Sequence, residues 1–223
     1  MTERWKKYFI DHRAFGENWL MAAVAHWNFH ETLYGMIEAI CPPGSQLLDV
    51  GCGPGWSGIY LSSRGFKFTG IDNERDLINL AIKNNERLNG RANFEVADAF
   101  DLSGLNKKFD LSFSCGVLEH FDRDITIKLL QEQAKISRYV LIEIPTKYTS
   151  YTGAITDERI YTMGQLVRIV EDAGMKVVSQ FGYGDITATQ FHVLTRRILP
   201  RFIYRILQNC GYAYAIAVIG ERK

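Results

Sequence analysis

From Gln46 onward, short apolar runs alternate with segments of helical period, and this alternation constrains the fold more than any other feature of the chain. Apolar runs that we expect to form strands cover residues 46–50, 66–71, 92–96, 109–113 and 139–144. Amphipathic segments that we expect to form helices lie near 57–63, 76–88, 123–137 and 162–173. Strands that alternate with helices favour parallel pairing and right-handed crossovers. Continuous apolar strands fit a sheet that is covered on both faces. The sequence therefore predicts an α/β fold with helices on both sides of the sheet.

The two ends of the chain differ from this alternating region. The first forty residues are rich in aromatic and apolar side chains at roughly helical spacing, and the pattern stops at Pro42-Pro43-Gly44. Two further strand candidates, 176–183 and 212–220, are separated by an irregular segment. We expect an N-terminal helical cap over 1–45 and a core over 46–223, with a helical insertion near 185–211.

Three acids follow or end three consecutive strand candidates. Asp49 precedes the turn Gly-Cys-Gly-Pro-Gly at 51–55, Asp72 ends the second candidate, and Asp98 comes just after the third. In an open parallel sheet the ligand crevice lies at the carboxyl ends of the strands, so the three acids should converge on one crevice. Asp72 can accept hydrogen bonds from a ribose diol, although a helix N-cap is an alternative role for it.

A dinucleotide-binding site is the first alternative interpretation of this turn. Its fingerprint, Gly-x-Gly-x-x-Gly, fails here because Trp56 occupies the third glycine position. Pro54 also removes an N–H donor that a pyrophosphate would use. A cationic sulfonium amino acid makes no such demand, and Asp49 suits its ammonium group. The sequence therefore disfavours a nucleotide-dependent oxidoreductase.

Residues 47–55 resemble the first motif of class I S-adenosylmethionine-dependent methyltransferases. Gly70-Ile71-Asp72 resembles the ribose-binding acid of that family, Asp98-Ala99-Phe100 its adenine contact, and 109–120 its fourth strand with the loop that follows. The resemblance implies a Rossmann-like, seven-stranded, mostly parallel sheet of order 3-2-1-4-5-7-6 whose last strand is antiparallel. It also implies S-adenosyl-L-methionine as the cofactor. The cofactor contacts that it implies are Asp49, Gly51, Cys52, Gly53, Gly55, Asp72, Asn73, Asp98, Ala99, Phe100 and Cys115.

The loop after the fourth strand carries the candidate catalytic residues. Methyl transfer needs a base only where the acceptor must lose a proton, and His120 titrates in a suitable range. Glu119 is the second candidate; alternatively, His120 caps or packs the start of the next helix. His26 and His30 have a spacing that can hold a metal, but no third ligand follows them, so we expect a metal-independent reaction.

The acceptor side of the site is less constrained by sequence. Trp27, His30, Tyr34 and Tyr148 are candidates for an aromatic wall around an acceptor. The loop after the fourth strand lacks the Asn/Asp-Pro-Pro-aromatic motif that accompanies methylation of amides and DNA bases in this family. We expect a small-molecule acceptor that is methylated at oxygen or nitrogen. A partner subunit that binds the cofactor without turnover is the alternative.

The net charge and the cysteine content limit which partners and which cellular compartment we expect for the chain. The formal net charge is +1, which gives no reason to expect DNA as a partner. The four cysteines form no Cys-x-x-Cys pair, and no apolar signal region follows the first lysines, so we expect a cytoplasmic protein. Residues 194–207 form a basic amphipathic pattern, for which packing on the chain's own domain is favoured over membrane contact. Nothing in the sequence indicates the oligomeric state.

Overall fold

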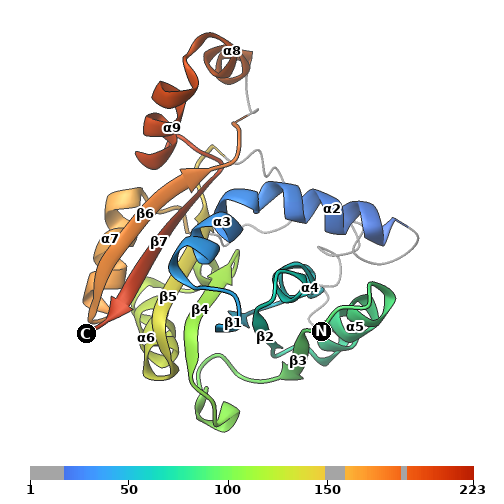
Figure 1. Ribbon diagram of the computed structural model, residues 1–223. Coiled ribbons are helices and arrows are strands. Elements are labelled where there is room, and N and C mark those ends of the chain that lie inside the picture. Colours follow the sequence, from blue (N-terminus) through green and yellow to red (C-terminus); the bar gives the residue numbers. More distant parts are fainter. Residues whose placement is uncertain (1–17, 149–158, 187–189) are drawn as a thin grey trace. The chain divides into compact units, whose positions relative to one another are not determined.

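A computed structural model describes residues 18–148, 159–186 and 190–223 (Figure 1). Its seven strands have the order β3-β2-β1-β4-β5-β7-β6, which confirms the predicted topology. By contact density the chain divides into two compact units, Met1–Phe113 and Ser114–Lys223.

The first unit contains the cap helices and the strands that precede the candidate site. Its elements are α2 (Trp19–Phe29), α3 (Glu31–Ile40), β1 (Gln46–Val50), α4 (Trp56–Ser63), β2 (Lys67–Asp72), α5 (Arg75–Arg87), β3 (Asn93–Val96), the 3-10 helix η1 (Ser103–Leu105) and most of β4 (Phe109–Cys115). Strand β1 pairs in parallel with β2 and β4, and β2 pairs in parallel with β3. The parallel pairing that the alternating pattern predicts is therefore present in this unit.

Glycines let the first helix after β1 lie close to the sheet. A Cβ atom on Gly58, in α4, would lie 2.6 Å from Phe68 Cε1, and one on Gly70, in β2, would lie 2.7 Å from Phe94 Cδ1. A Cβ atom on Gly55 would lie 2.8 Å from Phe94 Cζ. Real Cβ atoms do not approach other carbons this closely, so the two phenylalanine rings occupy space that glycine leaves open. This packing fixes the start of α4 against β2 and β3.

The second unit contains the antiparallel part of the sheet. Its elements are η2 (Leu118–His120), α6 (Arg123–Ile136), β5 (Ser137–Pro145), α7 (Met163–Asp172), β6 (Met175–Tyr183), α8 (Gln190–Ile198), α9 (Arg201–Asn209) and β7 (Ala215–Arg222). Strand β7 is antiparallel to both β5 and β6, as the family resemblance implies. The predicted helical insertion contains α8 and α9, and Pro200 is the N-cap of α9.

Strand β7 begins three residues later than the sequence pattern predicts. The N–H of Tyr212 donates to Leu207 O, at 2.9 Å, and the N–H of Tyr214 donates to Gly184 O, at 3.1 Å. The first hydrogen bond closes the C-terminal end of α9. The second joins the segment just before β7 to the loop after β6, so neither N–H is available for pairing between strands. In the part of the chain that the structure describes, no helix has the length and apolar character needed to cross a bilayer.

Candidate functional site

The glycine turn after β1 is held against the end of β2 by its own backbone. Gly51, Gly53 and Gly55 have φ values of 85°, 49° and 82°, in the left-handed region that glycine adopts at little cost. The N–H groups of Gly51 and Cys52 both donate to Ile71 O, at 2.8 and 2.9 Å. Gly55 is the N-cap of α4, so the turn leads directly into a helix N-terminus, as predicted.

Asp72, the last residue of β2, links the turn to the second strand. Its Oδ2 atom accepts a hydrogen bond from Gly53 N–H at 3.1 Å, and its Oδ1 atom accepts one from Glu74 N–H at 3.0 Å. The N-cap of α5 is Glu74, so the alternative of an Asp72 N-cap is wrong. Each oxygen of this oriented carboxylate keeps a lone pair that can accept from a ligand hydroxyl.

Asp49 lies one residue before the end of β1 and is almost fully buried, with 4% of its surface exposed. Burial raises the pKa of its carboxyl well above the ordinary value, and the nearby Asp72 raises this pKa further. Burial also raises the pKa of the Cys52 thiol, and the charges of both aspartates add to that effect. A cation beside Asp49 would relieve the repulsion between the carboxylates and favour the ionised form.

The third acid lies beyond the end of β3. Asp98 follows Val96, the last residue of that strand, by two positions, and its Oδ1 atom accepts a hydrogen bond from Phe100 N–H at 2.9 Å. The N–H of Ala97 donates to Asp72 O at 3.1 Å, so the segment leaves β3 beside the end of β2. The side chains of Asn73 and Asp98 are exposed, and Phe100 is 47% exposed. Acids thus lie at or next to the carboxyl ends of β1, β2 and β3 in the first unit.

Sequence reasoning missed Asn84, on α5. This side chain is fully buried, and its Nδ2 atom donates to Pro54 O at 3.0 Å. It therefore fixes the carbonyl of the one residue in the turn that has no N–H of its own. No sequence signal identified it, because it lies among other polar residues in an amphipathic helix.

The aromatic residues assigned to an acceptor wall contact α4. Trp27 Nε1 donates to Trp56 O at 2.8 Å, and the hydroxyls of Tyr34 and Ser57 are hydrogen-bonded at 3.1 Å. The Tyr34 ring stacks on Tyr60 with centroids 4.7 Å apart. Trp27 and Tyr34 therefore dock the cap helices on the helix that follows the glycine turn. Their role toward an acceptor stays a prediction.

The buried His30 and the half-buried His26 lie next to this contact. The His26 and His30 rings have centroids 4.0 Å apart, and His26 Nε2 lies 3.1 Å from Ser57 Oγ. Burial lowers the pKa of His30 to about 4, and it lowers the pKa of His26 well below the ordinary value, with the charge of His30 adding to the effect. Both rings are therefore neutral at physiological pH.

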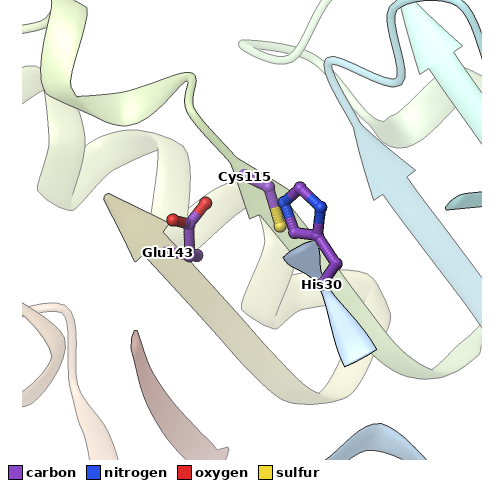
Figure 2. Close-up of side chains that lie close together, drawn as sticks. All are labelled: His30, Cys115 and Glu143. Atoms are coloured by element: carbon purple, nitrogen blue, oxygen red, sulfur yellow. The ribbon is translucent and has the colours of Figure 1, made fainter. Parts of the chain in front are cut away.

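In the second unit, Cys115 and Glu143 lie together on neighbouring strands (Figure 2). Glu143, on β5, is 5% exposed and hydrogen-bonded to the Cys115 thiol. Burial raises the pKa of its carboxyl to about 8, although the hydrogen bonds from Cys115 and from Gly116 N–H act against this shift. Sequence reasoning missed Glu143, but an acid inside the apolar run Val140-Leu141-Ile142-Glu143-Ile144 was an available signal.

The candidate base and its neighbour are both buried in η2. The Glu119 side chain is 3% exposed and the His120 side chain is 9% exposed, and His120 Nε2 lies 3.8 Å from Glu119 Oε1. Arg159 donates from its backbone N–H to Glu119 O and from Nη1 to His120 O. The N-cap of α6 is Asp122, so His120 does not cap that helix. This distance is within the range of an ion pair but longer than a hydrogen bond.

Tyr148, the remaining acceptor candidate, packs its ring edge against Tyr212 at a centroid distance of 5.2 Å. The predicted site residues thus divide between the units. Trp27, His30, Tyr34 and the cofactor set up to Phe100 belong to the first unit, and Cys115, Glu119, His120 and Tyr148 belong to the second.

Residues 47–138 match the family described as a methyltransferase domain. The chain is 27% identical to phosphoethanolamine N-methyltransferase 1 of Arabidopsis thaliana over 165 residues, which are 71% of this chain and 33% of that protein. It is 34% identical to an O-methyltransferase of Pyrenophora dematioidea over 83 residues, which are 36% of this chain and 31% of that protein. The chain therefore spans about a third of the length of these curated relatives.

Among solved structures, the magnesium protoporphyrin IX methyltransferase of Synechocystis with bound S-adenosylhomocysteine is similar to the chain. The TM-score is 0.67 at 17% identity, and the match covers 99% of this chain and 94% of that one. At this identity the likeness establishes the fold and not the acceptor. The strand order, the acid-flanked glycine turn and the family match agree, so residues 47–138 match a methyltransferase domain and the chain has the fold of S-adenosylmethionine-dependent methyltransferases.

Proposed function

We propose that this protein transfers the methyl group of S-adenosyl-L-methionine to an oxygen or nitrogen of a small-molecule acceptor. The observation that carries the proposal is the glycine turn between two acids. Asp49 is buried on one side of the turn, and Asp72 accepts a hydrogen bond from Gly53 N–H on the other. A buried acid and an oriented acid at one turn suit a ligand that carries both an ammonium group and a ribose.

Each part of the cofactor has a candidate partner in the first unit. Asp49 would hold the ammonium of the methionine part, and the two oxygens of Asp72 would accept from the ribose hydroxyls. Asp98 and the backbone near Phe100 would contact the adenine. Bound there, the cofactor supplies an activated methyl group, and the protein's task is to align it and to exclude water.

A general base would provide proton transfer where the acceptor needs it. A hydroxyl acceptor must lose its proton during transfer, whereas a neutral amine attacks with its own lone pair. We assign the base to His120, and Glu119, whose Oε1 atom lies 3.8 Å from His120 Nε2, would favour the protonated imidazole by its charge. The two relatives, one named for N-methylation and one for O-methylation, support leaving both acceptor atoms in the proposal.

The cofactor assignment can be tested by replacing Asp72. The change Asp72→Ala should weaken the binding of S-adenosylhomocysteine by about 1.5–3 kcal/mol, the range for hydrogen bonds to a charged group. Isothermal titration calorimetry measures this directly. The matched control is Asp110→Ala, because Asp110 Oδ2 also accepts a backbone N–H, that of Gln46 at the opposite end of β1. Unchanged affinity in a folded Asp72→Ala protein would remove the assignment.

A partner subunit that binds the cofactor without turnover is the second candidate function. Calorimetry cannot distinguish such a subunit from an enzyme, because both bind the cofactor. The test is therefore whether the methyl group is transferred to an acceptor. Radiolabelled S-adenosylmethionine is incubated with the protein and a small-molecule extract, and labelled products are resolved by chromatography. Transfer that is lost in Asp72→Ala identifies the enzyme. Tight cofactor binding with no labelled product across the extract favours the partner subunit.

A further inference from the structure

The two helices between β6 and β7 present apolar side chains to solvent. Leu194 and Ile198 on α8 are 52% and 68% exposed, and they lie one helical turn apart. Phe202 and Ile206 on α9 are 67% and 58% exposed, again one turn apart. The sequence favoured packing of this segment on its own domain, but these four side chains stay outside. We term these four exposed residues the outer face of α8 and α9.

The side of α9 that carries Tyr204 and Gln208 already packs on the chain's own fold, so the outer face cannot take its place there. Tyr204 is 7% exposed, and Gln208 Nε2 donates to Gly184 O at 3.3 Å. Asn209 Oδ1 accepts from Gly182 N–H at 3.3 Å. A Cβ atom on Gly182 would lie 2.0 Å from Gln208 O, so the helix backbone rests directly on β6. This contact holds α9 in one orientation, with Phe202 and Ile206 turned away from the sheet.

The outer face is also basic. Arg196, Arg197, Arg201 and Arg205 are exposed, and the sequence contains no Asp or Glu between residues 186 and 220. Arg196 pairs with Asp185 at 3.0 Å, and within the described ranges none of the other three has a salt bridge. Arg201 and Arg205 immediately precede Phe202 and Ile206 in sequence, so guanidinium groups flank the apolar side chains.

Charge decides which partner fits this face. Two copies of the chain that met through it would bring Arg197, Arg201 and Arg205 against the same three arginines, with no acid on either helix to pair with them. A symmetric interface must be self-complementary, so this face does not suit a second copy. An anionic bilayer offers both missing partners. Its phosphates accept from guanidinium groups, and the boundary between headgroups and acyl chains accepts apolar side chains. Helices with this composition lie in the plane of the interface and do not cross it.

We propose that α8 and α9 form a docking surface for anionic phospholipid bilayers. Leu194, Ile198, Phe202 and Ile206 insert at the headgroup boundary, and Arg197, Arg201 and Arg205 bind lipid phosphates. The inference does not depend on methyl transfer, because none of these residues belongs to the proposed cofactor or catalytic set.

The test is co-sedimentation of the full chain with two kinds of vesicle. One contains phosphatidylcholine alone, and the other contains phosphatidylcholine with phosphatidylserine. We expect sedimentation with the anionic vesicles and weaker sedimentation as salt is raised. Arg201→Gln with Arg205→Gln should lower the partition coefficient by roughly 25-fold, since each basic residue near such a surface contributes roughly fivefold. Phe202→Ser with Ile206→Ser should lower it comparably.

Matched controls use exposed residues elsewhere. Leu20→Ser with Met21→Ser changes two exposed apolar residues of α2, and Arg91→Gln with Arg168→Gln removes two exposed arginines. Both control proteins should bind the anionic vesicles like the unmodified chain. Equal sedimentation with both vesicle types, or equal loss in the controls, would overturn the proposal. A concentration-dependent dimer that Phe202→Ser with Ile206→Ser abolishes would overturn it in favour of a second copy as the partner.

Discussion

Asp72 shows how far a single position can be interpreted from sequence. An acid at the end of the second apolar run predicted a ligand contact, and the structure places its carboxylate on the N–H of Gly53. Glu143 shows the opposite case, because motif spacing passes over an acid inside an apolar run, and its hydrogen bond with the Cys115 thiol of the neighbouring strand follows only from the tertiary structure. Motif spacing identifies residues at strand ends. It does not identify polar side chains that tertiary packing encloses.

His120 is the residue whose replacement should affect turnover without affecting the cofactor. His120→Ala should lower kcat by roughly 10²–10⁴-fold for a hydroxyl acceptor, the usual yield of general-base catalysis. The affinity for S-adenosylhomocysteine should stay unchanged, because the proposed cofactor acids are in the first unit. In the unmodified enzyme a protonated base lowers kcat on the acid side of the pH profile, and the variant should lose that limb. Near-full turnover with the acid limb intact would assign His120 a packing role beside Glu119.

At the scale of elements, apolar runs predicted where strands exist but not where they end. Strand β4 runs to Cys115, two residues beyond its predicted end, and β7 starts at Ala215. Ends depend on hydrogen bonds to other elements, such as that between Tyr214 N–H and Gly184 O. The orientation of α9 was equally hard to predict, because its apolar side chains share one side and the sequence does not show whether that side faces the sheet or the solvent. Contact with β6 decides which face is buried.

At the same scale, the packing of α4 predicts how two glycine substitutions change the stability of the fold. Gly58→Ala should destabilise the fold by about 1–3 kcal/mol, the usual cost of overpacking, because the new Cβ atom would lie 2.6 Å from the Phe68 ring. Gly35→Ala is the matched control, since Gly35 lies within α3 and has nothing within 4 Å of an added Cβ atom. That control should stabilise the protein by about 0.5–1 kcal/mol. Urea unfolding measures both changes, and equal midpoints for the two variants would contradict the packing argument.

At the scale of the whole molecule, a buried imidazole and a buried carboxyl group limit the pH range in which the fold is most stable. His30 takes up a proton near pH 6.5 when unfolded and near pH 4 when folded. Its contribution to stability is therefore complete above pH 6.5 and is lost as the pH falls below that value. Glu143 has an ordinary pKa of 4.5 and a folded pKa of about 8. Its contribution is complete below pH 4.5 and is lost as the pH rises toward 8.

Glu143→Gln separates the two effects, because glutamine keeps a neutral polar group of the same shape at every pH. The free energy of unfolding at pH 7 should rise on the order of 3 kcal/mol relative to the unmodified protein, since the unfolded glutamate no longer gains by ionising. Below pH 4.5 the two proteins should differ little, and the acid-side loss from His30 should persist in both. The measurement is urea unfolding at a series of pH values, with Glu171→Gln on the exposed side of α7 as the control. A difference between Glu143→Gln and the unmodified protein that is constant across this pH series would show that Glu143 is not held protonated by its surroundings.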